Sequence, residues 1–114
     1  MRIESAVFYT SDIENGKNFY ENKIGLKIDS YQEGKFVSFL FENGVKLSIK
    51  KASEEREVPG KQTIFITADD IKSLFQKYKD VGFTFFKEYE ETSWGSQFSV
   101  ADPDNNKIVF VNRK

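Results

Sequence analysis

The sequence predicts an α+β fold made of two βαβββ repeats, which form a curved mixed sheet with helices on its outer face. Short runs of β-forming residues alternate with two amphipathic stretches, and the second half of the chain repeats the order of the first. The 114 residues suffice for one compact domain and are too few for two ordinary ones. We therefore expect a single domain over residues 1–114, with repeats 1–51 and 61–114 joined by the polar linker 52–60.

The first repeat opens with β-forming residues at 2–10, which predict a strand. Ser11 and Glu14 have the spacing of a capping box, so a helix is expected to begin there. Three apolar side chains should share the inward face of this helix: Ile13, Tyr20 and Ile24.

Two glycines are expected to shape the first helix. Gly16 would allow a close approach to a sheet, and Gly25 would end the helix in a left-handed conformation. Asn43 and Gly44 form the strongest short hairpin signal in the chain, because both residue types tolerate positive φ. The strands predicted after this helix are at 26–31, 35–41 and 45–50.

The second repeat has the same order, beginning with a predicted strand at 62–68. Asp69 is expected to cap a helix that ends at Gly82. The apolar stripe of that helix follows the spacing i, i+3, i+4 and i+7, at Ile71, Leu74, Phe75 and Tyr78. The remaining strands are predicted at 83–89, 95–101 and 107–112.

The two repeats correspond residue by residue at three places. The matched pairs are Asp12-Ile13 with Asp70-Ile71, Tyr20 with Tyr78, and Gly25 with Gly82. Chance could produce one helix after one strand, but two matched sets of five elements indicate a true internal repeat.

The chain contains no cysteine and no histidine. It therefore has no disulfide, no thiolate ligand and no cysteine nucleophile, and it lacks the commonest general base and transition-metal ligand. Any metal ion would have to be held by carboxylates, carbonyls and water, which suits magnesium or calcium better than zinc.

Charge and hydropathy argue against nucleic acid and membranes as partners. The net charge is −1 and the basic residues are scattered, so no nucleic-acid partner is expected. No apolar run approaches the roughly 20 residues of a membrane helix, and the first residues lack the pattern of a secretory signal. We therefore expect no membrane partner and a cytoplasmic location.

Four segments of the chain contain distinctive sequence motifs. They are SAVFYTSDIENGKNFY at 5–20, IGLKI at 24–28, TIFITADDI at 63–71 and SWGSQFSVADPDNNKIVFV at 93–111. In this order they resemble the vicinal oxygen chelate superfamily of glyoxalases, bleomycin-resistance proteins and extradiol dioxygenases. In character the chain is similar to the metal-free bleomycin-resistance-like members, because of what stands at the family's ligand positions.

In metal-dependent members the resemblance implies ligands on the first, fourth, fifth and eighth strands. Carried over to this chain, these positions are Ser5, Leu47, Thr63 and Val109. Leucine and valine cannot donate to a metal, and two hydroxyls are too few for a divalent ion. We therefore expect no metal and no cofactor, which disfavours metal-assisted lyase or dioxygenase chemistry.

The same four positions imply a groove that suits an organic small molecule. Strand alternation adds Val7, Tyr9, Ile49, Phe65 and Val111 to its face, giving apolar walls with few polar groups. The alternative is that these side chains collapse together and fill the groove. The predicted ligand-binding residues are Ser5, Val7, Tyr9, Leu47, Ile49, Thr63, Phe65, Trp94 and Val109.

Three further features each allow two interpretations. Trp94 is the only tryptophan, and it is either a lid over a ligand or a cap over the core. The acidic residues Glu88, Glu90 and Glu91 could attract a cationic ligand, although a solvated loop is the simpler interpretation. The turn 102–106, Asp-Pro-Asp-Asn-Asn, could suggest a cation site, but side-chain bonding within the turn explains it better.

These features favour a binding protein for a drug or metabolite over an enzyme, and they suggest a role in antibiotic resistance. The resemblance implies a homodimer. The alternatives are a metal-independent or metal-dependent lyase, isomerase or dioxygenase, or a non-catalytic dimeric scaffold. A metal-free enzyme could use Glu4, Tyr9 or Glu42 as acid or base, but nothing marks these as a matched pair. The sequence leaves open the ligand and whether the repeats pair within one chain or between chains.

Overall fold

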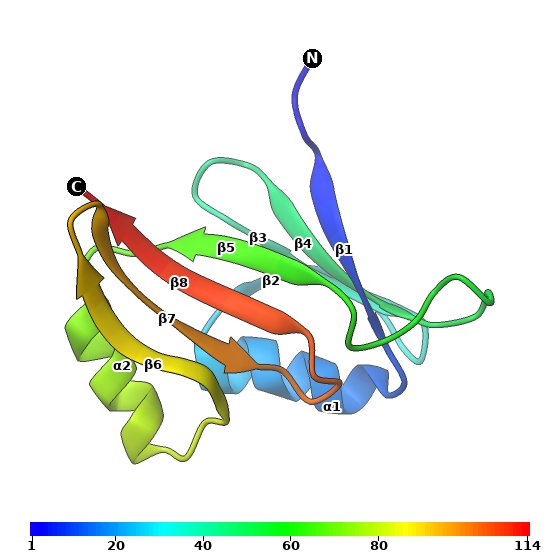
Figure 1. Cartoon of the computed structure of the whole chain (residues 1–114). Coiled ribbons are helices and arrows are strands. Elements are labelled where there is room, and N and C mark those ends of the chain that lie inside the picture. Colours follow the sequence, from blue (N-terminus) through cyan, green and yellow to red (C-terminus); the bar gives the residue numbers. More distant parts are fainter. The chain divides into compact units, whose positions relative to one another are not determined.

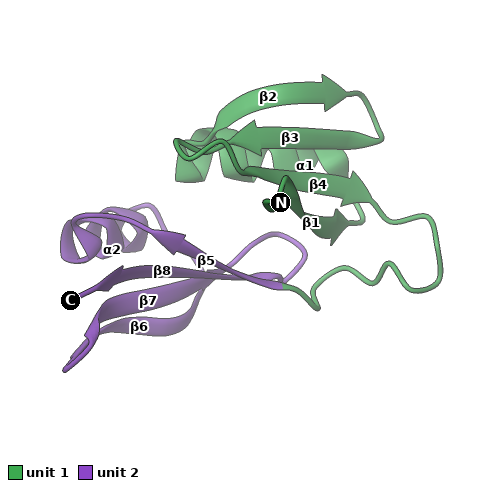
Figure 2. Ribbon diagram, turned by 90° about the horizontal axis from the view of Figure 1, so that it is seen from above, with its two compact units in different colours: residues 1–62 green, residues 63–114 purple.

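The computed structural model describes all residues of the chain, Met1 to Lys114. They form two compact units, residues 1–62 and 63–114, drawn in green and purple in Figure 2. Each unit contains a four-stranded mixed sheet and one helical segment after its first strand (Figure 1). The predicted α+β fold with two βαβββ repeats is confirmed.

Unit 1 contains the first repeat and the linker. Its sheet has the order β1-β4-β3-β2, with β1 parallel to β4 and the other pairs antiparallel. The helix α1 continues directly into a π-helical segment, η1, which ends at Gly25 with a φ of 94°. The elements are β1 (Ser5–Thr10), α1 (Ile13–Asn18), η1 (Phe19–Ile24), β2 (Lys27–Gln32), β3 (Phe36–Leu40) and β4 (Lys46–Lys51).

Unit 2 repeats this topology with the sheet order β5-β8-β7-β6. Again the first and last strands, β5 and β8, run parallel, and the other pairs are antiparallel. The elements are β5 (Thr63–Thr67), α2 (Ile71–Asp80), β6 (Phe85–Thr92), β7 (Gly95–Ala101) and β8 (Lys107–Arg113). Neither helix in the chain is long and apolar enough to cross a membrane.

The helix caps differ from the prediction by one residue. Asp12, not Ser11, caps α1, because its carboxylate accepts a hydrogen bond from the Asn15 backbone at 3.2 Å. Glu14 does not close a capping box, and its carboxylate instead accepts the Tyr31 hydroxyl.

The same shift occurs at the second helix. Asp70, not Asp69, caps α2 by accepting the Ser73 amide at 3.1 Å and the Ser73 hydroxyl at 2.9 Å. These two hydrogen bonds from Ser73 lower the pKa of the Asp70 carboxyl. Asp69 contributes only its backbone oxygen, which accepts from the Asn112 amide group at 2.9 Å.

The two matched tyrosines occupy the centres of the two cores. Tyr20 packs against Phe8, Phe19 and Phe39, with ring centroids 5.1–6.5 Å away. Tyr78 is equally buried among the rings of unit 2, and burial raises the pKa of its phenol to about 12. The rings in contact with Tyr78 are Phe83, Phe98 and Phe110. The internal repeat therefore places one buried tyrosine between helix and sheet in each unit.

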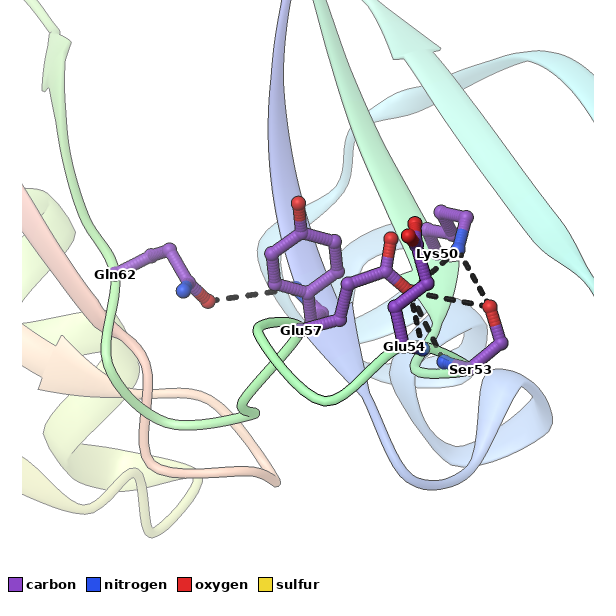
Figure 3. Close-up of polar contacts among 6 residues, drawn as sticks. Lys50, Ser53, Glu54, Glu57 and Gln62 are labelled. Atoms are coloured by element: carbon purple, nitrogen blue, oxygen red, sulfur yellow. Dashed lines mark hydrogen bonds and ion pairs between the residues drawn. The ribbon is translucent and has the colours of Figure 1, made fainter.

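The linker 52–60 lies within unit 1 and is fastened to it by Glu57. The buried Glu57 carboxylate accepts from the Lys50 ammonium at 2.6 Å, the Ser53 amide at 2.9 Å and the Glu54 amide at 3.3 Å (Figure 3). These hydrogen bonds lower the pKa of Glu57 to about 2, and the one from Lys50 has the largest effect. At the end of the unit, the Gln62 side chain accepts the Tyr9 amide at 3.4 Å. The predicted linker is thus a fixed part of unit 1.

Candidate functional site

In unit 1, the helix covers one face of the sheet, and we call the opposite face the helix-free face. A Cβ atom on Gly16 of α1 would lie 3.4 Å from Cγ2 of Ile49, which shows that Ile49 faces the helix. Its parallel-strand partner Phe8 is buried on the same side. The neighbouring residues Val7 and Tyr9 of β1 therefore lie on the helix-free face.

The predicted placement of Leu47 and Ile49 in the groove is wrong. Both side chains point to the helix side and are 0% and 1% exposed. Their β4 neighbours Lys46, Ser48 and Lys50 occupy the helix-free face instead, opposite Ser5, Val7 and Tyr9. Successive side chains of a strand point to opposite faces, so a placement that is off by one residue puts a side chain on the wrong face.

The helix-free face of unit 1 is more polar than expected. The Ser30 and Ser38 hydroxyls are 2.7 Å apart, and the Lys46 ammonium lies 3.2 Å from the Asp29 carboxylate. Lys50 is engaged by Glu57 of the linker. Both lysines of β4 on this face are therefore paired with a carboxylate, while Ser48 lies between them.

In unit 2, the strand register separates the two faces in the same way. Phe98 and Phe110 pair with one another and contact Tyr78 of α2, so they mark the helix side. The alternate residues of β5 and β8 therefore share the helix-free face. They are the predicted Thr63, Phe65, Val109 and Val111, together with Thr67 and Lys107.

A shallow depression lies on the helix-free face of unit 2. Its cavity volume is about 140 Å³, which is below the usual range for small-molecule sites. Its floor is apolar and its rim carries amide, hydroxyl and ammonium groups. The lining residues are Phe65, Lys87, Gln97, Phe98, Ser99, Lys107 and Val109. Of these, only Phe65 and Val109 were among the predicted ligand-binding residues.

The acidic segment before Trp94 is part of a strand, not a solvated loop. Residues 88–91 lie within β6, whose side chains pair with neighbours. Glu90 accepts the Gln97 amide group at 2.8 Å and lies 3.0 Å from the Lys87 ammonium, and these contacts lower the pKa of Glu90. Glu91 accepts the Tyr89 hydroxyl at 2.9 Å. Two of the three carboxylates are thus already engaged within the chain.

Trp94 lies at the turn between β6 and β7 and is 39% exposed. The Arg113 guanidinium lies 5.1 Å from the centre of its ring, and its backbone oxygen accepts the Lys114 amide at 2.8 Å. Trp94 does not line the depression of unit 2. Its use as a lid over a ligand stays a prediction.

The turn after β7 uses its aspartate to hold the backbone, as predicted. The buried Asp102 carboxylate accepts from the Asp104 amide at 2.9 Å and from the Asn106 amide at 2.8 Å. Its second oxygen accepts from the Asn106 side chain at 3.0 Å. Asn105 completes the turn with a φ of 75°.

The residues at the family's metal positions do not fit a metal ion. Leu47 is in the core, Val109 cannot donate, and Ser5, Ser48 and Thr63 offer only hydroxyls. No group of three or more histidine, cysteine, aspartate or glutamate side chains could hold a metal ion.

Sequence reasoning missed the polar residues of both helix-free faces: Ser38, Lys46, Ser48, Lys50, Lys87, Gln97, Ser99 and Lys107. A signal was present in β4, where Lys46-Leu47-Ser48-Ile49-Lys50 alternates polar and apolar residues. In a sheet covered by a helix on one face, the apolar set belongs to the core.

Comparison with known proteins adds a family and several solved structures. Residues 2–110 match the family model described as the Glyoxalase/Bleomycin resistance protein/Dioxygenase superfamily. No curated protein matches the chain.

The solved structures share the fold at low sequence identity. An antibiotic binding protein, TnmS3 from Streptomyces sp. CB03234, has a TM-score of 0.85 and 21% identity over 100% of this chain and 97% of its own. A superfamily member from Sphaerobacter thermophilus DSM 20745 has a TM-score of 0.81 and 24% identity, covering 97% and 96%. A lactoylglutathione lyase from Agrobacterium tumefaciens has a TM-score of 0.80 and 17% identity, covering 96% and 92%. At these identities the likeness concerns the fold alone.

Proposed function

The chain belongs to the Glyoxalase/Bleomycin resistance protein/Dioxygenase superfamily, and we propose that it binds an organic small molecule on the helix-free faces of its sheets, without a metal ion. The observation that carries this proposal is the depression in unit 2, with Phe65 and Val109 on its floor and polar groups at its rim. An apolar surface with a few placed polar groups is the usual composition of a small-molecule site.

Two further observations support binding over metal-assisted catalysis. Val109 stands at a position where metal-dependent relatives are expected to carry a ligand and cannot donate, and Leu47, carried over to another such position, points into the core. The similar fold of TnmS3, described as an antibiotic binding protein, is consistent with a drug or metabolite as the ligand. With this function we propose a cytoplasmic homodimer.

The revised binding residues follow the observed faces. In unit 1 we propose Val7, Tyr9 and Ser48, with Ser48 replacing Leu47 and Ile49. In unit 2 we propose Phe65 and Val109 together with the polar rim described above.

The test is thermal melting with a panel of antibiotics and aromatic metabolites, in buffer with and without a metal chelator. A ligand selective for the native state stabilises it by about 2.7 kcal/mol at roughly 100 times its Kd. We expect such a ligand to raise the melting temperature equally in both buffers. Stabilisation that requires a divalent metal would contradict the metal-free proposal.

A pair of variants locates the site. Phe65→Ser removes the exposed ring of the depression, whereas Val81→Ser removes an equally exposed apolar side chain after α2. The ligand-induced rise in melting temperature should shrink in Phe65→Ser and persist in Val81→Ser. An unchanged rise in both variants would place the ligand elsewhere.

A further inference from the structure

Ser99 is a buried side chain without a hydrogen-bond partner in the chain. It is 3% exposed, lies on β7 opposite Val109, and lines the depression of unit 2. Every fully enclosed side-chain nitrogen or oxygen in the protein has a partner, and the Ser99 hydroxyl makes no such bond. Its oxygen therefore keeps its access to solvent through the depression, where it can donate to a bound group.

Lys107 is a cation at the same rim without a carboxylate partner. The four ion pairs of the protein use Lys17, Lys46, Lys50 and Lys87, and none uses Lys107. Its ammonium lies over the ring of Phe86, 5.9 Å from the centroid. Lys107 thus retains a positive charge that an anion can neutralise.

The charged residues that line the depression are all cationic. The depression is lined by two ammonium groups, Lys87 and Lys107, and by no carboxylate. Lys87 is partly neutralised by Glu90 at 3.0 Å, so the strongest attraction for an anion lies on the side of Lys107. A cationic ligand would meet repulsion there without a compensating acceptor.

The floor beside these groups is flat and apolar. Phe65 is 57% exposed, and it is the strand partner of the buried Val109. An exposed ring next to a buried valine offers a stacking surface for another ring. Lys107 lies on the same face, two residues before Val109 along β8.

We infer that this depression selects an aromatic carboxylate, with the ring on Phe65 and the carboxylate between the Lys107 ammonium and the Ser99 hydroxyl. This inference rests on the proposed function, since it names the ligand class for the same site. The ionised carboxylate supplies the acceptor for two donors that the chain leaves unused.

The test compares 2-naphthoate with the neutral 2-naphthamide, which has the same ring and nearly the same shape. Binding is measured by titration with amide chemical shifts, which also locate the site. We expect the carboxylate to bind at least about tenfold more tightly than the amide, because charge-assisted hydrogen bonds are the stronger ones. Perturbed amides should include those of Phe65, Ser99 and Lys107.

Variants assign the preference to residues. Lys107→Met keeps the apolar stem and should reduce naphthoate affinity to that of naphthamide. Ser99→Ala should weaken naphthoate binding several-fold. Lys72→Met, on the exposed surface of α2, is the matched control and should change neither affinity.

The outcomes separate this inference from the proposed function. Equal binding of both probes, or full naphthoate affinity in Lys107→Met, overturns the carboxylate inference and leaves a small-molecule site standing. Failure of both probes while a neutral or cationic drug raises the melting temperature also overturns the inference alone. Failure of every compound, in titration and in melting, overturns both.

Discussion

Gly95 follows Trp94 at the start of β7, where the backbone of β8 leaves no room for a side chain. A Cβ atom at this position would lie 2.2 Å from the Asn112 oxygen and 2.9 Å from the Arg113 Cα. The φ of Gly95 is 151°, which side-chain-bearing residues rarely adopt. The Trp-Gly pair is thus explained by the approach of two backbones.

Gly95→Ala should therefore be strongly destabilising, by about 3 kcal/mol, because both the steric overlap and the backbone conformation oppose it. The matched control is Gly44→Ala, with a φ of 84° and nothing within 4 Å of the added Cβ atom. That change should cost only about 1 kcal/mol, from the backbone term alone. Urea unfolding measures both, and equal losses would refute the close-approach explanation.

At the scale of elements, the linker is held against β4 because one buried carboxylate accepts several hydrogen bonds. Glu57 holds the Lys50 side chain of β4 and two backbone amides of its own turn. Composition alone predicts a polar linker at 52–60, but it does not show which carboxylate of the linker is buried. That choice depends on Lys50 lying on the helix-free face, next to where the linker returns.

The Glu57 pKa of about 2, below its ordinary 4.5, predicts a pH dependence of stability. The unfolded chain binds the proton more tightly, so the contribution of Glu57 is complete above about pH 4.5 and is lost as the pH falls toward 2. Urea unfolding across this range should show a smaller pH dependence in Glu57→Gln than in the wild type. Glu55→Gln, at an exposed linker position, should keep the wild-type dependence. A wild-type profile in Glu57→Gln would contradict the fastening role.

At the scale of the whole molecule, the same βαβββ plan is used twice, with one helix packed on one face of each sheet. The faces differ in what they do. The helix side carries the aromatic core, and the helix-free side carries serines, lysines and the exposed Phe65. The proposed binding surface therefore lies on the opposite face of the same strands from the core.

This division predicts unequal costs for two apolar truncations. Leu47→Ala opens a cavity in the core and should cost about 3 kcal/mol. Phe65→Ala removes a mainly exposed ring and should cost about 1 kcal/mol or less. Denaturant unfolding compares the two, and a cost for Phe65→Ala as large as that for Leu47→Ala would mean that the ring is covered in solution.

Much of the fold follows from local patterns in the sequence. The period of the apolar residues distinguishes strands from helices, the glycines mark where helices end, and the matched Tyr20 and Tyr78 reveal the repeat. These features depend on neighbours a few residues apart, so they can be read without a structure. The predicted caps are wrong by one residue because Ser11-Asp12 and Asp69-Asp70 each offer two capping side chains in sequence.

The candidate site depended on tertiary structure. Strand alternation says which residues share a face, but only the packing of α1 against Ile49 decides which face is the core. Likewise, Lys87 on β6, Ser99 on β7 and Lys107 on β8 lie on three different strands and are brought together by strand pairing. The sequence by itself determined the repeated fold, because local propensity and periodicity encode it. Only the tertiary structure decided the site, because the register and the helix contact choose which side chains of each strand remain accessible.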